Sequence, residues 1–543
     1  MNTKTELLDS AKTWVRNYFD QADVVEKQLE FITGSTDINR PNRLCVTLSD
    51  IHLTDGTVGL QNLRIEVWDA FYISIKSRCK KYGIEELVFV LDGDVIDMIR
   101  TSKWAENGIY PWERSRKAEF SKVVQDIVKD IVDTEHKAFF QWIRELPEKL
   151  KSDTNVKEVN IVVTLGNHDK ELLIDQAALA YFYTEGLGQK LDKIPLDYRK
   201  MIGRMYGDEM RFTDPTSAPY LPFYYGDRGF RFFTTHGQWR DKENSLAIKA
   251  NNDLPGWSAK DGWQPEIWAT LAYSPFLAPC FGDTIAAGVL STFIYKVKEN
   301  FEKIGYHDPK LNRIIDELDL YRPTYGALIR ILKETSEMKA QNKGKEAIEI
   351  IERTLYLCSI EWLSWEYTYK SSPLWRQILF YLIRYLLPVL KLVGIEIIAI
   401  KNLMEFVYNI KRWNPFNKTG ETIKNMRGFP GFLPEYQHYG FQIHGEGHTH
   451  VPIQEEPNIA GKKSCSYINF GTWRDQVVMK KGKVDGENSY RRRGMLRALF
   501  ILDIQNNKKD GTPRSYDYFT EDIIHWGDRA DNTSLADRYQ PHI

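Results

Sequence analysis

Cysteine is scarce in this chain of 543 residues, and its arrangement argues against two classes of protein. The five cysteines are scattered, odd in number and never in C-x-x-C spacing, so the sequence indicates neither a disulfide framework nor a thiolate metal site. The opening residues Met1–Glu6 are polar and contain no apolar signal core, which argues against secretion. We therefore expect reduced thiols and a cytoplasmic protein.

Net charge and long apolar runs are also lacking. A formal net charge of -1 gives no overall field to attract nucleic acid, so contact with nucleic acid is possible but unsupported by charge. The short basic runs at 480–483 and Arg491–Arg493 are typical of solvated loops. In the apolar stretch 374–400, charged residues interrupt every run before it reaches the roughly 18 residues that a bilayer span needs. With 42% hydrophobic residues, however, the chain can bury large cores, and its length suggests two or three structural units.

Five short segments rich in Asp, Asn and His are the most informative feature that is present. Most follow or end an apolar, β-rich run, and open α/β sheets place their ligands at such strand ends. Their side chains offer oxygen and imidazole nitrogen without thiolate, a set suited to Mn, Fe, Zn or Mg. The segments are Ser49–His52, Gly93–Asp97, Gly166–Asp169, His236 and Gly447–His450.

Spacing within the segments favours a pair of metal ions. Asp50 and His52 are two residues apart, so on an extended backbone both point to one face and can chelate one ion. His448 and His450 have the same spacing and would lie roughly 6 to 7 Å apart on an extended backbone, so each could reach a different ion. Asp94 has two carboxylate oxygens and follows a glycine that permits a tight turn, so it could bridge the two ions.

The order of the segments resembles the calcineurin-like metallophosphoesterase superfamily, whose pattern runs D-x-H, G-D-x-x-D, G-N-H-D/E, a lone H and G-H-x-H. The resemblance covers about 43–240 and 438–504. It implies two divalent ions, with Mn favoured, and a bridging role for one carboxylate. The ligands implied are Asp50, His52, Asp94 and His450 for one ion, and Asp94, Asn167, His236 and His448 for the other.

The same resemblance implies hydrolysis of a phosphate ester through attack by a hydroxide held between the ions. His168 would contact the phosphoryl oxygen or protonate the leaving group, Asp169 would orient His168, and Asp97 would lie behind the ligands. A structural role is expected for His444, which has no counterpart in the family pattern. A non-catalytic module that kept the fold is disfavoured, because every expected metal position carries a competent residue.

The motifs argue against two groups of the superfamily but do not identify the substrate. Protein phosphatases of the superfamily end the second segment in Asp-Arg-Gly and have Glu after the third segment's histidine, whereas Asp97–Ile99 and Asp169 stand here. The lipid-A-pathway pyrophosphatases usually have Arg where this chain has His168. We expect a phosphodiester or a phosphorylated metabolite as the substrate. A nuclease and a membrane-associated hydrolase of lipid phosphate or pyrophosphate remain alternatives.

The spacing of the segments predicts the domain organisation. Strands and helices alternate up to about residue 240, and the motifs then stop for about two hundred residues, a gap longer than any ordinary loop. We expect an α/β fold, a metallophosphoesterase-type β-sandwich flanked by helices, with a large mainly α-helical insertion. The parts expected are an N-terminal helical extension (1–42), the two halves of the catalytic domain (43–240 and 431–520), the insertion between them as a cap or interaction domain (241–430) and a C-terminal tail (521–543).

The most apolar stretch of the insertion, Leu374–Ile400, has two interpretations. A helix that is apolar all round is usually internal, which favours the buried core of a cap or an interface in a homo-oligomer. The alternative is a peripheral membrane contact or acyl-chain-binding surface, with Arg384 and Lys391 reaching towards lipid headgroups. Pro388 and Gly394 are expected to kink or split the helix.

Overall fold

The computed structural model describes the chain in segments, and the expected N-terminal extension lies largely outside them. No helix within these segments is both long and apolar enough to cross a membrane. The described residues are 32–33, 37–59, 63–189, 221, 224–238, 241, 243–245, 257–258, 262–263, 277–322, 325–394, 397–398, 400, 402, 441–456, 466–481, 488–505 and 514–530.

A seven-stranded mixed sheet carries the first three motifs. Its order is β4-β3-β2-β14-β13-β9, with β15 paired to β14; β2, β3 and β4 are parallel, and β14 is antiparallel to β2. β15 runs through the first residues of the segment expected to be a tail. The strands are β2 (Arg43–Leu48), β3 (Glu86–Asp92), β4 (Glu158–Thr164), β9 (Tyr321–Arg322), β13 (Gly471–Lys481), β14 (Asn488–Gln505) and β15 (Arg514–Ala530).

A second mixed sheet carries the last two motifs, in the order β1-β5-β6-β10-β12-β11. β5 and β6 form an antiparallel hairpin, and β10 pairs in parallel with β6 although it lies far along the chain from it. This pairing brings the fourth and fifth motifs together. The strands are β1 (Ile32–Thr33), β5 (Tyr224–Asp227), β6 (Phe232–Thr235), β10 (Ile443–Glu446), β11 (Ile453–Glu455) and β12 (Ser466–Asn469), and a separate pair is formed by β7 (Trp257–Ser258) and β8 (Gly262–Trp263).

Alternation along β2 divides the core between the two faces of the first sheet. Leu44 and Val46 belong to the apolar cluster shared with the helices, whereas Cys45 lies in a cluster with Phe232 and Ile443 of the second sheet. Because successive side chains of a strand point to opposite faces, the two sheets pack face to face. The fold is therefore mixed α/β with two sheets, as the sequence predicts at that level.

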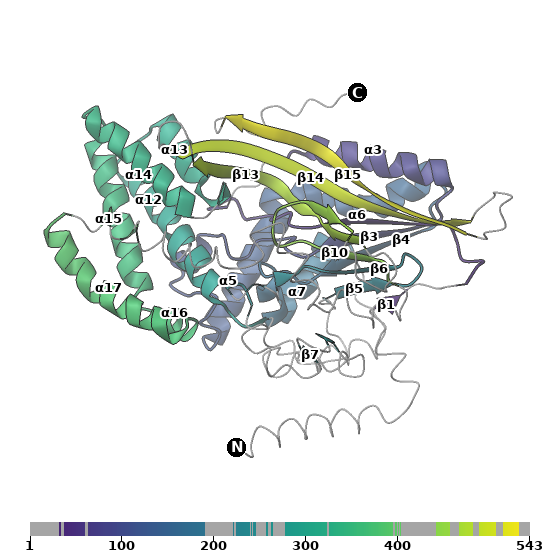
Figure 1. Ribbon diagram of the computed structural model, residues 1–543, viewed down its shortest axis with the longest axis horizontal. Helices are drawn as coiled ribbons and strands as arrows, with labels where there is room; N and C mark the ends of the chain where they lie inside the picture. The colour runs from purple at the N-terminus through teal and green to yellow at the C-terminus, as the bar shows by residue number, and fades with distance from the viewer. Residues whose placement is uncertain are drawn as a thin grey trace, which may run out of the picture.

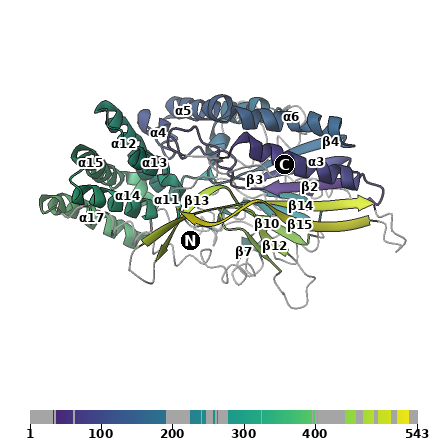
Figure 2. The same ribbon diagram turned by 90° about the horizontal axis from the view of Figure 1, so that it is seen from above.

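Helices cover the outer face of β2–β4 (Figure 2). The long helical stretch between β3 and β4 is divided into α5, the π-helix η1 and α6. The elements on this side are α3 (Ile65–Tyr82), α4 (Lys103–Glu106), α5 (Lys117–Lys129), η1 (Asp130–Glu135), α6 (Lys137–Asp153), η2 (Lys170–Ile174), α7 (Gln176–Tyr181) and η3 (Phe182–Gly186).

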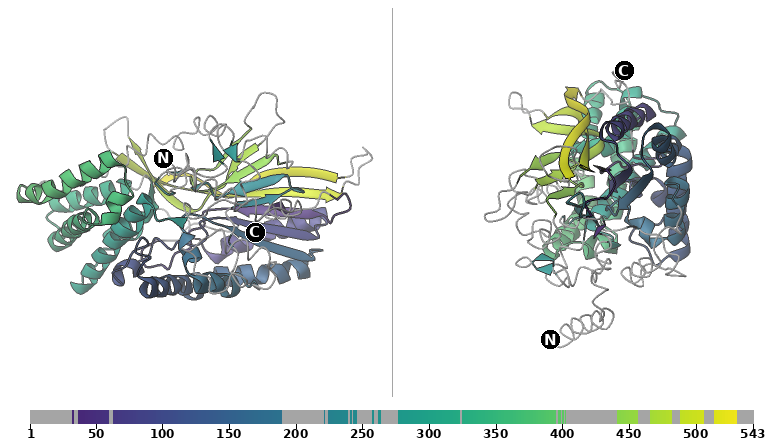
Figure 3. Two further views of the ribbon diagram at one scale, coloured as in Figure 1. Left: turned by 90° about the horizontal axis from the view of Figure 1, so that it is seen from below. Right: turned by 90° about the vertical axis from the view of Figure 1, so that its right-hand side faces the viewer.

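Residues 281–392 form a mainly helical segment at one end of the molecule, away from the tip of the β14–β15 hairpin (Figure 1, Figure 3). Pro388 lies inside α17 without splitting it, and Gly394 follows the helix end with a φ of 71°. The elements are α11 (Phe281–Asp283), η8 (Thr284–Ser291), α12 (Thr292–Lys303), α13 (Pro309–Asp316), η9 (Leu318–Leu320), α14 (Tyr325–Ala340), α15 (Lys345–Trp362), α16 (Glu366–Lys370) and α17 (Leu374–Leu392).

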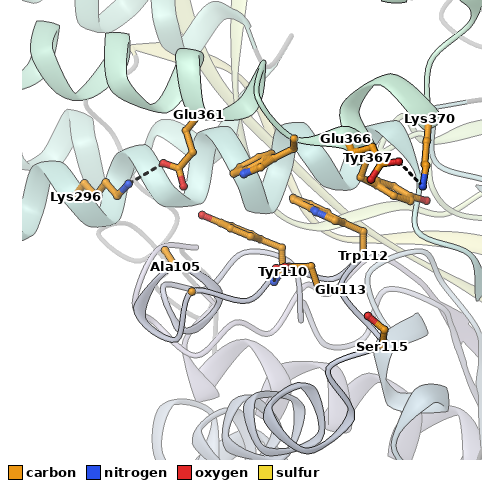
Figure 4. A pocket seen from close by; sticks show the side chains of 12 residues that line it. Ala105, Tyr110, Trp112, Glu113, Ser115, Lys296, Glu361, Glu366, Tyr367 and Lys370 are labelled. Atoms are coloured by element: carbon orange, nitrogen blue, oxygen red, sulfur yellow. Dashed lines mark hydrogen bonds and ion pairs between the residues drawn. The ribbon is translucent and has the colours of Figure 1, made fainter.

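An aromatic cluster joins this helical segment to the loop before α5. The rings of Tyr110 and Trp112 stack with centroids 4.9 Å apart, and Trp365 lies 5.0 Å from Trp112. Tyr367 stacks on the other side of Trp112 and donates a hydrogen bond to the backbone of Pro279. These rings line a cavity of about 580 Å³ (Figure 4). Because the rings pack on one another, the cluster holds the helical segment against the loop before α5.

A buried ion pair also connects the helical segment to the residue that follows the third motif. The Nζ atom of Lys170 lies 2.5 Å from Oδ2 of Asp283, and both side chains are buried. Burial lowers the pKa of Lys170, but Asp283 outweighs burial and raises it overall. Breaking such a pair leaves one charge buried without its partner.

We expect Lys170→Met to lower the free energy of unfolding by about 3 to 5 kcal/mol, measured by chemical denaturation. The double variant Lys170→Met/Asp283→Leu should recover part of this loss because it also removes the stranded carboxylate. Lys296→Met is the matched control, since its partner Glu361 is 37% exposed, and it should cost less than about 1 kcal/mol. Equal losses in the two single variants would contradict the expectation.

Candidate metal centre

The structure brings the five sequence segments to one place. Three groups of side chains have ligand atoms close enough together to hold a metal ion, and Asp94 belongs to two of them. One group lies mainly on the first sheet's loops, and another combines Asp94 with residues that follow the second sheet's strands. The three groups are Asp50, His52, Asp94 and His450; Asp94, His236 and His448; and His52, Asp97 and His168.

Adjacent parallel strands position the first two motifs. β2 and β3 end side by side, and the chain after each strand continues the ladder irregularly: the N–H of Asp50 donates to Gly93 and that of His52 to Asp94. Trp473, at the start of β13, donates its N–H to the carbonyl of Asp50 from the other side. The two motifs are therefore fixed by backbone hydrogen bonds as well as by side chains.

The backbone at the cluster is not extended, which corrects the spacing argument. Asp50, His52, Asp94, His448 and His450 all have φ between 50° and 66°. Left-handed backbone is uncommon for residues other than glycine and costs on the order of 1 kcal/mol or more each, so it persists only where surrounding structure imposes it. These five are most of the positive-φ non-glycine residues among those described, which number seven. Strain is concentrated at this site.

Close packing explains two of the glycines. A Cβ on Gly166 would lie 2.2 Å from Oδ1 and N of Asp94, and a Cβ on Gly447 would lie 1.9 Å from Oγ of Ser49. Neither glycine has a positive φ, so both are needed for space and not for a left-handed turn. Any side chain at either position would displace the carboxylates.

Asp97 is the centre of the histidine-orienting contacts. Its Oδ1 lies 2.7 Å from Nδ1 of His168 and its Oδ2 lies 3.1 Å from Nδ1 of His52, while Arg100 donates to the same carboxylate at 3.0 Å. Burial raises the pKa of Asp97, but His168 and Arg100 outweigh burial and hold it well below its usual range. The ionised carboxylate therefore leaves Nε2 of each ring as the atom available to a ligand or substrate.

Asp169 does not orient His168, contrary to the expectation from the sequence. Its carboxylate accepts backbone N–H groups from Asp94 at 2.6 Å, Ile96 at 3.0 Å and Gly166 at 3.0 Å. Asp169 therefore holds the second and third motifs together from behind. Asp97 takes the orienting role because its side chain, and not that of Asp169, reaches the imidazole.

The second group forms where the two sheets meet. Nδ1 of His236 donates to the backbone oxygen of Asp92 at 2.8 Å, and Nε2 of His236 lies 3.2 Å from Oδ2 of Asp94. Nδ1 of His448 lies 2.9 Å from Oδ1 of Asn167. The amide oxygen of Asn167 therefore lies beside this group.

Electrostatics favour ligation in this cluster. Burial raises the pKa of Asp50, but His236 and His450 outweigh burial and hold it well below its usual range. Burial lowers the pKa of His236, but Asp94 and Asp50 overcome burial and raise it to about 10. Without a metal, His236 therefore keeps a proton near neutral pH. A metal ion would take the place of that proton, so metal binding here should release protons.

Orphaned polar atoms test whether a metal fits. Oδ1 of Asp50 and Nε2 of His236 are buried and make no hydrogen bond, although Nε2 of His450 lies 3.1 Å from the first and Oδ2 of Asp94 lies 3.2 Å from the second. Nε2 of His52 and Nε2 of His450 face each other at 2.9 Å, a spacing that suits two ligands of one ion. Buried polar atoms normally find partners, so a cation at the cluster would satisfy the atoms left over. Oxygen and imidazole donors without thiolate suit Mn, Fe, Zn or Mg.

Three neighbouring residues were not identified from the sequence. Asp241 places Oδ2 3.2 Å from Nε2 of His448, and Ser49 donates to Oδ2 of Asp50 at 2.7 Å. Burial is the main cause that holds the pKa of His450 well below its usual value. Arg322, on β9 of the helical segment, lowers this pKa further. Only Ser49 lay within a motif; the others come from strands and loops that carry no recognisable pattern.

His444 lies apart from these groups. Its Nε2 is 2.8 Å from Oε1 of Glu446, and both side chains are buried on β10. Among the described residues it joins none of the ligand groups, in agreement with the structural role expected.

Comparison of the chain with protein-family models, curated proteins and solved structures gives no match.

Proposed function

We propose that this protein is a metal-dependent phosphoric ester hydrolase with a dinuclear centre. The observation that carries the proposal is the position of Asp94, whose carboxylate belongs to two ligand groups at once. A shared carboxylate is the arrangement that a pair of ions about 3.5 to 4 Å apart requires. The order of the five motifs, which resembles the calcineurin-like metallophosphoesterase superfamily, supports the same conclusion.

The ligand assignment follows the geometry and the motif order together. Bound divalent ions would supply Lewis-acid polarisation of the phosphoryl oxygens and acidify a water molecule. Mn is the favoured metal, with Fe, Zn and Mg as alternatives. The proposed ligands are Asp50, His52, Asp94 and His450 on one side, and Asp94, Asn167, His236 and His448 on the other.

Protein groups supply orientation and proton transfer. His168 is held at Nδ1 by Asp97 and its side chain is 12% exposed, so Nε2 can donate a proton to a leaving alkoxide or a hydrogen bond to a phosphoryl oxygen. The substrate we propose is a phosphodiester or phosphorylated metabolite. Its charged oxygens would meet the centre between the sheets and the helical segment.

Arg322 is expected to contribute to substrate binding. Its Nη1 atom donates only to the backbone carbonyls of Asp319 and Tyr321, and no carboxylate in the described residues forms an ion pair with it. Burial lowers the pKa of Arg322 to about 9, with Arg100 and Arg474 adding to the effect. An incoming phosphate would give the guanidinium of Arg322 a negatively charged partner.

We expect Arg322→Gln to raise KM about tenfold with a smaller change in kcat, measured by steady-state kinetics on the best substrate. Arg313→Gln is the control, since its partner Glu317 lies on the same helical turn and its side chain is 40% exposed. A fall in kcat at unchanged KM would assign Arg322 to the chemical step instead.

The proposal is tested by metal analysis and a substrate panel with the full chain. Metal content is measured after loading with Mn, Fe, Zn or Mg, and turnover is measured on bis-p-nitrophenyl phosphate, p-nitrophenyl phosphate, cyclic nucleotides, single-stranded DNA and a lipid phosphate. Two bound ions and turnover on at least one ester are expected. A protein that binds no metal, or that binds metal and hydrolyses none of these esters, would overturn the proposal.

The panel also separates the alternatives. Activity on DNA alone would identify a nuclease, which the formal net charge of -1 does not favour. Activity on the lipid phosphate alone would identify a lipid hydrolase.

A further inference from the structure

The outer face of α17 is an apolar surface exposed to solvent. Of the sixteen exposed large hydrophobic side chains among the described residues, eleven lie between residues 374 and 398. Monomeric proteins rarely expose so large a contiguous apolar patch unless it binds something. We call it the α17 face; its members are Leu374, Trp375, Ile378, Tyr381, Leu382, Tyr385, Leu386, Val389, Leu392 and Val393.

The spacing of these residues places them on one side of the helix. They recur every three or four positions from Leu374 to Val393, which is the period of a single helical face. Exposure reaches 74% at Tyr385 and 87% at Leu392. The expectation that this apolar helix is an internal core element is therefore wrong for this face.

The opposite side of α17 is firmly held. Arg376, Phe380 and Leu387 are buried. Arg376 donates two hydrogen bonds of 3.0 Å to the carboxylate of Glu243, and Phe380 stacks on Phe281 with centroids 6.0 Å apart. The helix is thus anchored to the fold through one side. α17 lies at the edge of the helical segment (Figure 1), and its other side is exposed.

Charge on α17 has one sign. The helix contains Arg376, Arg384 and Lys391 and no acidic residue. Glu243 neutralises the first of these, so two cations remain beside the apolar face, and Lys391 lies over the ring of Tyr356 with Nζ 4.2 Å from its centroid. Leucine-rich apolar faces flanked by cations, with Trp and Tyr among the exposed residues, are typical of helices that lie at an anionic membrane surface.

A second copy of the chain fits this surface poorly. Arg384 stands near the midpoint of Leu374–Leu392, so an antiparallel self-pairing would bring the two copies of Arg384 together with no acid on the helix to compensate. A membrane span is excluded for α17, because none of the described helices is long and apolar enough. A surface of anionic lipid headgroups complements both the charge and the apolar face.

We propose that α17 docks in the plane of an anionic lipid surface and makes the protein a peripheral membrane protein. The apolar face would enter the boundary between headgroups and acyl chains, while Arg384 and Lys391 contact lipid phosphates. This inference rests on the exposed helix alone and is independent of the proposed hydrolase activity.

Vesicle flotation tests the proposal with the full chain. The chain should float with vesicles of phosphatidylcholine and phosphatidylglycerol in equal parts, bind less to phosphatidylcholine alone and dissociate partly at high salt. The triple variant Leu382→Ser/Leu386→Ser/Val389→Ser should bind the mixed vesicles at least about tenfold more weakly, because three apolar contacts are removed.

Ile73→Ser is the matched control, since Ile73 is 65% exposed on α3 and should leave vesicle binding unchanged. Thermal unfolding checks that the triple variant folds. A wild-type chain that fails to float with the mixed vesicles would overturn the proposal, as would a folded triple variant that floats equally well. A wild-type dimer that the triple variant converts to monomers would also overturn it and assign the face to a second copy. The hydrolase proposal would stand in each case.

Discussion

Asp94→Ala is expected to abolish metal loading and to reduce turnover by at least about a thousandfold. Asp94 is the only carboxylate among the described residues that belongs to two of the ligand groups. Its Oδ2 lies 3.2 Å from Nε2 of His236, while its Oδ1 accepts the backbone N–H of His168 at 2.8 Å. Removing the carboxylate therefore removes a ligand from both groups and loosens the loop that carries His168.

The loss of metal in Asp94→Ala should be measurable directly, without an activity assay. Elemental analysis after gel filtration should find less than one ion per chain in Asp94→Ala, against two in the wild type. Asp94→Asn should retain partial loading because one amide oxygen remains as a neutral ligand. Asp316→Ala is the control, since Asp316 is 47% exposed and pairs with Lys298 on the surface. Normal loading and turnover in Asp94→Ala would exclude a bridging role.

The residue types of the site could be predicted from the sequence because the donor set and the order of the motifs are local features. The backbone geometry of these residues could not be predicted from the sequence. The prediction that Asp50 and His52 point to one face assumes an extended backbone, whereas both residues have positive φ. That conformation is imposed by hydrogen bonds to Gly93 and Asp94 and by Trp473, contacts between segments that a single-sequence pattern does not contain.

The orienting role shows a similar limit. Asp97 and Asp169 each end a motif, and only the folded loops decide which carboxylate meets which group. Asp169 meets three backbone N–H groups, and Asp97 meets two imidazoles. Arg322 was missed for the same reason, since it comes from a two-residue strand far from any motif.

The helical segment could be predicted in content but not in environment. The apolar stretch Leu374–Ile400 identifies α17 near its observed bounds, because helix formation is a local property. Burial is decided by packing: Phe380 and Leu387 are buried, but Leu386, beside Leu387 in the sequence, is 51% exposed. Composition alone makes α17 apolar all round, and only the structure distinguishes its two sides.

His168→Ala is the second substitution with a large expected effect, and its result should differ in kind from that of Asp94→Ala. Metal content should stay at the wild-type level, because Nδ1 of His168 is bound to Asp97 and His168 is not one of the proposed ligands. Turnover should fall by about 10² to 10⁴-fold, the usual contribution of a positioned general acid or hydrogen-bond donor. His307→Ala, on an exposed histidine beside Asn312, should change neither quantity.

Leaving-group dependence distinguishes the two roles open to His168. If Nε2 protonates the departing oxygen, His168→Ala should slow alkyl phosphodiesters more than p-nitrophenyl esters, because p-nitrophenolate leaves without a proton. If Nε2 instead stabilises charge on phosphorus, both ester classes should slow equally. Asp97→Asn should show the same pattern in weaker form, because it leaves His168 in place but removes the charge that fixes Nδ1. Full turnover of His168→Ala on both ester classes would exclude either role.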